Sequence, residues 1–216
     1  MGTVTIAAAY GAGGSVIAPA VAERLGLPLV DRAIPVALAH ELADTLRHAL
    51  ADDEHRQPGP VGRALLRAMD LSGLFVGVPV PARQLGADEG VAATEEALRR
   101  VADRGGAVVL GRAGVFVLRR RLDTLHVRLD GSGSARLRQA MSHEGLDEAT
   151  AAVQLRETDR ARSAYVRHFY PGERWEDPAN YHLVIDSTAI ALDVCVDVIV
   201  AAALDRFARA AATAPA

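Results

Sequence analysis

A glycine-rich turn near the start of the chain has the residue types of an anion-binding site. Residues 8–15 read AAYGAGGS and lie between an apolar run over 3–8 and an amphipathic helical pattern over 15–25. Glycines in a strand-to-helix turn let several backbone N–H groups point at one anion, and the helix N-terminus adds partial positive charge. This layout predicts a phosphate-binding loop whose hydroxyl would be a ligand of Mg²⁺. The residues expected to bind the phosphates are Gly11, Ala12, Gly13, Gly14 and Ser15, and Ser15 is the candidate metal ligand.

The same turn departs from the standard phosphate loop, G-x-x-x-x-G-K-[ST], at two positions. Gly13 and Ser15 match that pattern, whereas Ala8 and Gly14 stand where glycine and lysine are expected. The sequence contains no lysine, so its 24 basic residues are all arginines. We therefore expect anion binding by backbone N–H groups, and phosphoryl transfer only if other cations contribute. A plain tight turn without a ligand is the alternative interpretation of this stretch alone.

Arginines on a later helical stretch are the second group with suitable chemistry. In LRETDRARSAYVRHFYPGERWEDPANYHLVIDS, residues 155–187, Arg156 and Arg160 are four apart, and Asp159 lies three from Arg156 and three from Arg162. On a helix this spacing puts the arginines and the acid on one side. Guanidinium groups bind phosphate oxygens through two hydrogen bonds and stabilise a transferring phosphoryl group. A solvated, salt-bridged helix is the alternative for this spacing.

Two other stretches are interpreted as structural. A second glycine-rich turn, LDGSGSARLRQA over 129–140, is interpreted as a helix N-cap and connection, because a doubly wound sheet usually binds phosphate at its first turn or its topological switch point. Aromatic residues gather beyond the arginine stretch, where we expect them to pack the return to the last strand, with base stacking as the alternative. These aromatics are Tyr165, Phe169, Tyr170, Trp175 and Tyr181.

Composition limits the classes of partner. The chain has 216 residues, 50% of them hydrophobic, and a net charge of −3, which gives no overall attraction to nucleic acid or an anionic membrane. The most apolar stretch, 191–204, is interrupted by Asp193 and Asp197, and no secretory signal is recognisable. For these reasons we expect a cytoplasmic protein. We also expect no disulfide framework, because Cys195 is the single cysteine. The sequence leaves the oligomeric state open.

The elements that must position these residues alternate along the chain. Short apolar runs recur over 3–8, 28–30, 107–110, 124–129 and 182–185, with helical patterns between most of them. This order predicts an α/β fold, in which a five-stranded parallel sheet is covered by helices on both faces.

One domain over 1–210 is expected to contain all these elements. Its core is assigned to 1–32 and 104–210, with a lid over about 147–178, a last helix over 189–210 and a frayed tail over 211–216. Between the second and third strands lies an excursion over about 33–103, longer than a simple crossover requires. Its helical stretches are 33–51, 61–69 and 91–101.

Three blocks of sequence together resemble a known family. They are YGAGGSVIAPAVAERLGLPLVDR, VVLGRAGVFVLR and ETDRARSAYVRHFY with DPANYHLVIDS, and in this order they resemble the cytidylate kinase-like family. The resemblance implies a P-loop nucleoside monophosphate kinase with a helical excursion that binds the monophosphate. It implies transfer of the γ-phosphoryl group of ATP to CMP or dCMP, with Mg²⁺.

The resemblance also implies roles for individual residues. The loop over 11–15 would surround the ATP phosphates, and Asp31 would face the monophosphate site. Arg112, in GRAG, would contact the acceptor nucleotide. Asp159 and Arg162 match an Asp-x-x-Arg pair that engages the acceptor. The lid arginines near the phosphates, and the catalytic candidates, would be Arg156, Arg160 and Arg162.

The chain also departs from the family pattern. Gly14 and Ala113 replace a lysine and an aspartate of the cytidylate kinases, Ser15 stands where this branch tends to have arginine, and three alanines at 7–9 replace Ser-Arg-Glu. Three functions therefore stay open. They are an active kinase for CMP or dCMP, a catalytically weak or inactive nucleotide-binding protein on the same scaffold, and a P-loop kinase for another small metabolite.

Overall fold

The structure is a computed structural model that describes residues 2–31, 87–111 and 114–213. The chain divides into two compact units, Met1–Ala33 with Ala97–Ala216, and Ile34–Glu96. The first unit contains every strand of the described sheet. The helices expected over 33–51 and 61–69 lie outside the described residues, whereas the third expected helix is present as α4 (Ala87–Asp103).

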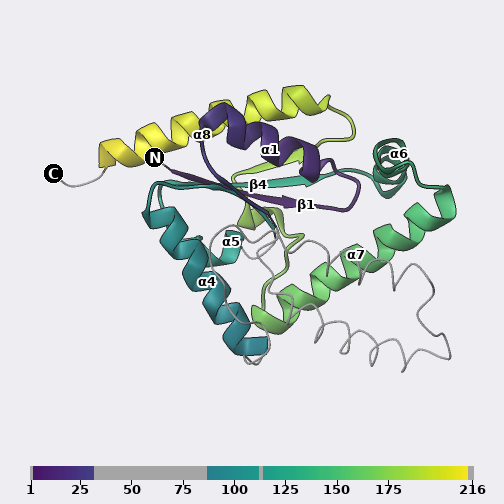
Figure 1. Cartoon of the computed structure of the whole chain (residues 1–216), viewed down its shortest axis with the longest axis horizontal. Helices are drawn as coiled ribbons and strands as arrows, with labels where there is room; N and C mark the ends of the chain where they lie inside the picture. Colours follow the sequence, from purple (N-terminus) through teal and green to yellow (C-terminus); the bar gives the residue numbers. More distant parts are fainter. Residues whose placement is uncertain (1, 32–86, 112–113, 214–216) are drawn as a thin grey trace. The chain divides into compact units, whose positions relative to one another are not determined.

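A five-stranded parallel sheet forms the centre of the first unit (Figure 1). Its spatial order is β2-β3-β1-β4-β5, so β1 lies between β3 and β4 and all neighbouring strands are parallel. The sequence-based expectation of an α/β fold with a parallel sheet is confirmed. Because the carboxyl ends of parallel strands meet at one edge, the turn after β1 begins at the edge where such sheets bind ligands. The strands are β1 (Thr3–Ala8), β2 (Leu29–Asp31), β3 (Val108–Leu110), β4 (Thr124–Asp130) and β5 (Leu183–Asp186).

Along β1 and β4, one face of the sheet carries apolar side chains and the other carries mainly polar ones. Val4 and Ile6 of β1 pair in register with Leu125 and Val127 of β4, and the face that carries Ile6 and Val127 is covered by α1 (Gly14–Leu25) and α8 (Leu192–Thr213). Figure 1 shows these two helices on one side of the sheet and α7 (Glu148–Phe169) on the other. The expected layers of helices on both faces are therefore present in the first unit.

The opposite face carries a buried polar cluster. Thr5 Oγ1 lies 2.7 Å from His126 Nδ1, and the His126 ring stacks on that of His182 with centroids 5.0 Å apart. Burial, followed by the electrostatic effect of His182, lowers the pKa of His126 from 6.5 to about 3. His126 is therefore neutral at ordinary pH, as its position inside the protein requires.

Helix ends follow the local sequence. Gly26 caps α1 in the left-handed region at φ 63°, which agrees with the expected stop. Ser132 caps α6 (Gly133–Glu144) by accepting a hydrogen bond from Ala135 N, as the second glycine turn predicted. The last helix runs over Leu192–Thr213 instead of 189–210, so the first part of the expected tail is helical. No helix among the described residues is long and apolar enough to cross a membrane. The short elements α5 (Gly114–Val117) and a 3₁₀ helix (Pro178–Asn180) complete the described secondary structure.

Candidate phosphate-binding site

The turn after β1 presents unused backbone donors at the carboxyl edge of the sheet. Gly11 and Gly13 have φ values of 75° and 70°, in the left-handed region that favours glycine. Ala12 N donates to Ala9 O at 3.1 Å, whereas no acceptor within the described residues takes a hydrogen bond from the other N–H groups over residues 11–15. Unused N–H groups in a glycine turn at a helix N-terminus suit an anion. The donors are the backbone nitrogens of Gly11, Gly13, Gly14 and Ser15.

The missing lysine has a steric cause. A Cβ added at Gly14 would lie 2.5 Å from the Cβ of Ala8 and 3.3 Å from Leu110 Cδ1. Position 14 therefore has to be glycine while position 8 is alanine. The standard loop has the opposite arrangement, with glycine at the position that corresponds to Ala8 and the lysine side chain at the position that corresponds to Gly14. The two departures from the standard pattern are thus coupled, because the methyl group of Ala8 occupies the space that a Cβ at position 14 would need.

Asp159 and Arg162 of α7 reach the start of this turn. Asp159 Oδ1 accepts a hydrogen bond from Tyr10 N at 3.1 Å, and Arg162 Nη1 donates to Ala8 O at 2.5 Å. The two side chains also contact each other, with Arg162 Nη1 3.4 Å from Asp159 Oδ1. The structure therefore brings together the predicted loop and the predicted Asp-x-x-Arg pair.

Arg136 is a member of the site that the sequence reasoning missed. Its Nη1 donates to Tyr10 O at 2.9 Å and to Asp159 Oδ2 at 2.7 Å, and its Nε donates to Gly131 O at 3.1 Å. It belongs to the second glycine turn, whose N-cap was predicted correctly. The sequence did contain a signal for it: Arg136 lies four residues after Ser132, which caps the helix that follows β4. The start of that helix lies at the same edge of the sheet as the turn after β1.

Tyr10 links the turn to α6 and α7. Its hydroxyl lies 2.7 Å from Glu144 Oε2 at the end of α6 and also contacts Gln154 of α7. Burial, followed by the hydrogen bond to Glu144, raises the pKa of Tyr10, so the phenol stays protonated and donates. Ser187 fixes the other side of the turn, since its Oγ donates to Ala12 O at 2.7 Å.

Other predicted residues are not brought to the turn. Arg156 and Arg160 are exposed on α7 and form no hydrogen bond or ion pair with the described part of the chain. Asp31 is exposed at the end of β2. Arg112 lies outside the described residues, as does Ala113.

The turn also has a candidate ligand for Mg²⁺. Ser15 is exposed in the first turn of α1, and its hydroxyl has no hydrogen-bond partner among the described residues. A free hydroxyl next to an anion-binding turn fits a metal held jointly by protein and phosphates. No group of three or more His, Cys, Asp or Glu side chains in the described residues could hold a metal by itself.

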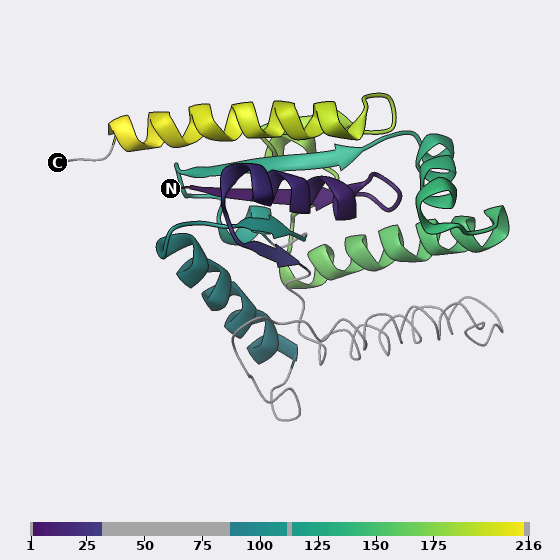
Figure 2. The same ribbon diagram turned by 45° about the horizontal axis from the view of Figure 1, so that its top comes forward.

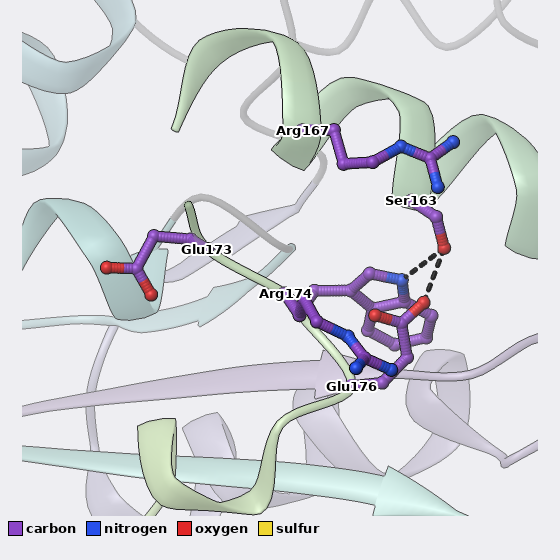
Figure 3. A pocket seen from close by; sticks show the side chains of 6 residues that line it. Ser163, Arg167, Glu173, Arg174 and Glu176 are labelled. Carbon is purple, nitrogen blue, oxygen red and sulfur yellow. Dashed lines mark hydrogen bonds between the residues drawn. The ribbon is translucent and has the colours of Figure 1, made fainter. Parts of the chain in front are cut away.

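A cavity of about 280 Å³ lies beside α7, and its lining is shown in Figure 3. Trp175 Nε1 donates to Ser163 Oγ at 2.9 Å, and Ser163 also contacts Glu176. Trp175 is buried, and the Arg128 guanidinium lies 4.3 Å from its ring centroid. Trp175 thus packs the return from α7 to β5, as expected for this group of aromatics. The cavity is lined by Ser163, Arg167, Glu173, Arg174, Trp175 and Glu176.

Known proteins share the sequence pattern and the fold. A family model described as the cytidylate kinase-like family matches residues 3–189. Uronate isomerase from Corynebacterium glutamicum is 35% identical over 107 residues, which are 50% of this chain but only 20% of that protein. An uncharacterized protein from Eubacterium ventriosum superposes with a TM-score of 0.61 at 19% identity, over 94% of this chain and 98% of that one. A gluconokinase from Sinorhizobium meliloti gives a TM-score of 0.48 at 22% identity, over 96% and 92%.

Proposed function

Because the chain belongs to the cytidylate kinase-like family, we propose that it is a phosphotransferase that moves the γ-phosphoryl group of ATP to CMP or dCMP. The observation that carries this proposal is the convergence of Asp159 and Arg162 on the glycine turn after β1. Phosphoryl transfer depends mainly on positioning and on stabilising charge. An arginine held at a phosphate-binding turn meets both requirements.

On the donor side, the unused N–H groups of Gly11, Gly13, Gly14 and Ser15 bind phosphate oxygens. The Ser15 hydroxyl would hold Mg²⁺, which neutralises phosphate charge when bound. Ser187 and Tyr10 keep the turn in shape by bonding its two ends. This division leaves the guanidinium groups to supply the positive charge that lysine supplies elsewhere.

On the acceptor side, we propose the residues that the family resemblance selects. The guanidinium of Arg162 contacts the end of β1, where a phosphoryl group would pass between donor and acceptor. Asp31, at the carboxyl end of β2, and Arg112 complete the proposed acceptor contacts, together with Asp159. Arg156 and Arg160 are proposed as lid cations that approach the phosphates when both substrates are bound.

One observation favours a second candidate. Half of the chain is 35% identical to a segment of a protein named uronate isomerase, and a uronate is a sugar acid. A sugar acid or another small hydroxylated metabolite is therefore the alternative acceptor. A nucleotide-binding protein without turnover is the remaining candidate, and Gly14 is the residue that motivates it.

An end-point assay tests these proposals. Purified protein is incubated with Mg-ATP and each nucleoside monophosphate or sugar acid in turn, and the products are separated by chromatography. We expect CDP or dCDP to appear, and we expect Arg162→Ala to lower the rate about 10³-fold or more. Arg160→Ala is compared with Arg162→Ala. It removes an exposed arginine of the same helix that does not contact the turn.

Each outcome separates the candidates. A phosphorylated sugar acid without CDP would transfer the proposal to the second acceptor class. Intact ATP with every acceptor, combined with ATP binding in calorimetry, would identify a binding protein. Full activity of Arg162→Ala would refute the assignment of the phosphoryl site to the end of β1.

A further inference from the structure

A loop without lysine needs another cation, and the structure restricts the choice. Lysine is absent from the sequence, and a side chain at position 14 is excluded by the Cβ of Ala8. Two guanidinium groups donate hydrogen bonds to the backbone of the turn region, that of Arg162 to Ala8 O and that of Arg136 to Tyr10 O. Arg162 is already assigned to the transferring phosphoryl group.

We propose that Arg136 of α6 binds the donor phosphates and supplies the charge that the lysine of a standard loop supplies. The inference rests on the proposed function, because it names a residue for the donor side of the same site. It concerns the phosphates of the donor and not its base.

The first argument is the placement of α6. A Cβ added at Gly11 would lie 2.2 Å from Arg136 O and 3.3 Å from Ala140 Cβ, so α6 packs directly on the turn. Figures 1 and 2 both show α6 beyond the end of β4, next to the turn between β1 and α1. One turn further along α6, Gln139 Nε2 lies 3.2 Å from the position of a Cβ at Gly13. The face of α6 that carries positions 136, 139 and 140 therefore covers the phosphate turn.

The second argument is that the guanidinium is held in place but not fully used. Its Nε bonds Gly131 O, and its Nη1 bonds Tyr10 O and Asp159. Nothing in the described part of the chain accepts a hydrogen bond from its Nη2. Only 12% of the side chain is exposed, so little freedom is lost when Nη2 takes a ligand oxygen.

The third argument is local charge. Asp159 is shared by Arg136 and Arg162, and Asp130 pairs with Arg128 at 2.6 Å while its other oxygen lies 3.7 Å from Arg136 Nε. Three arginines thus face two aspartates. Within this group of five side chains one positive charge is in excess, although the whole chain is negative. Partial burial limits solvent screening of this charge, which favours a polyphosphate.

A second donor on the same helix face supports a ligand at this place. Gln139 Nε2 is buried, and none of the described residues accepts a hydrogen bond from it. A buried amide N–H₂ without an acceptor is costly, and a ligand oxygen would remove that cost. Arg136 and Gln139 are three residues apart, so both project toward the turn from one side of α6.

Calorimetry without acceptor tests the inference. Mg-ATP and inorganic tripolyphosphate are titrated into wild type, Arg136→Gln, Arg136→Lys and Arg138→Gln. Arg138→Gln is the matched control, because Arg138 is exposed on the same helix and the change removes the same charge. We expect Arg136→Gln to weaken the binding of both probes about tenfold or more, Arg136→Lys to restore part of it, and Arg138→Gln to change it less than about twofold.

The opposite results are distinguishable. Equal affinity of wild type and Arg136→Gln for both probes would overturn the inference and leave the proposed reaction standing. Weaker ATP binding with unchanged tripolyphosphate binding would also overturn it, since Arg136 would then act on the base. If the wild type bound neither probe, the inference and the proposed function would fall together. Far-UV circular dichroism and thermal unfolding of each variant show whether an effect on binding is separate from an effect on folding.

Discussion

Substitutions that move one methyl group from position 8 to position 14 test whether the residues at these two positions are coupled by steric contact. In Gly14→Ala the new Cβ would lie 2.5 Å from that of Ala8, far inside the usual carbon separation of about 3.5–4 Å. Overpacking of this kind costs about 1–3 kcal/mol, and exchanging glycine for alanine in a helix returns about 0.5–1 kcal/mol. We expect a net loss of about 1–2 kcal/mol in the free energy of unfolding.

A double-mutant cycle isolates the contact. Ala8→Gly alone is expected to lose about 0.5–1 kcal/mol, because glycine is unfavourable in a strand. Combined with Gly14→Ala, it removes the overlap, so the double variant should be more stable than the sum of the single effects by about 1 kcal/mol or more. The backbone carbonyl at position 8 that binds Arg162 is retained in every variant.

Urea unfolding followed by far-UV circular dichroism measures the cycle. Gly133→Ala is the matched control, since Gly133 also begins a helix and a Cβ added there meets no atom within 4 Å. It should leave stability unchanged or raise it by up to about 1 kcal/mol. If Gly14→Ala behaved like this control, or if the two single effects simply added, the steric explanation would be refuted.

The same pair of positions gives a functional extension. The double variant Ala8→Gly with Gly14→Lys restores the standard pattern. A charge-assisted hydrogen bond from its lysine should make it bind Mg-ATP about tenfold or more tightly than the wild type. Gly14→Lys alone should fold less stably than the double variant, because its Cβ meets Ala8. Equal stability and equal affinity of these two variants would contradict the coupling between the positions.

Three further predictions concern side chains around the site and in the core. Tyr10→Phe removes the hydroxyl that binds Glu144, and we expect a loss of about 1 kcal/mol, seen as a melting temperature about 2–4 °C lower; an unchanged melting temperature would refute the link. Ser187→Ala leaves the buried carbonyl of Ala12 without this donor and should cost about 1–3 kcal/mol in urea unfolding; a smaller effect would mean that another donor replaces it. His126 has its pKa lowered to about 3 in the folded state, so the unfolded chain takes up a proton near pH 6.5 that the folded chain rejects. Stability should therefore fall as the pH drops from about 6.5 toward 3, by up to about 1.4 kcal/mol per pH unit from this group, and the fall should be less steep in His126→Gln; identical pH profiles would contradict the buried neutral histidine.

Much of the fold could be predicted because apolar runs and glycine stops are local signals. The run that became β1 and the stop at Gly26 were placed to the residue. The end of α8 was placed too early, because alanine-rich sequence after position 210 continues the helix without a breaking residue. The breaking signal in the sequence is Pro215, two residues after Thr213, and the end expected at 210 did not use it.

The candidate site could be predicted only in part, because its contacts join distant segments. The loop was predicted from one turn, and the Asp159–Arg162 pair from spacing within one helix together with the family resemblance; the structure places the two next to each other. Arg136 was missed because its role depends on α6 packing on Gly11, a contact over more than a hundred residues of sequence. The compatibility of Ala8 with Gly14 was also invisible, since each position alone was a mismatch to a motif. In both cases the information lies in three-dimensional proximity, which a motif does not contain.

The shared space at positions 8 and 14 also constrains the order in which substitutions can accumulate. From the present pair, a side chain can be accepted at position 14 only after Ala8 has become glycine, because the reverse order passes through the overlap with the Ala8 methyl. A chain with glycine at both positions is the permitted intermediate, and it has neither the methyl group that fills the space nor the lysine. A single substitution at position 14 therefore cannot return lysine to this loop without the overlap with Ala8.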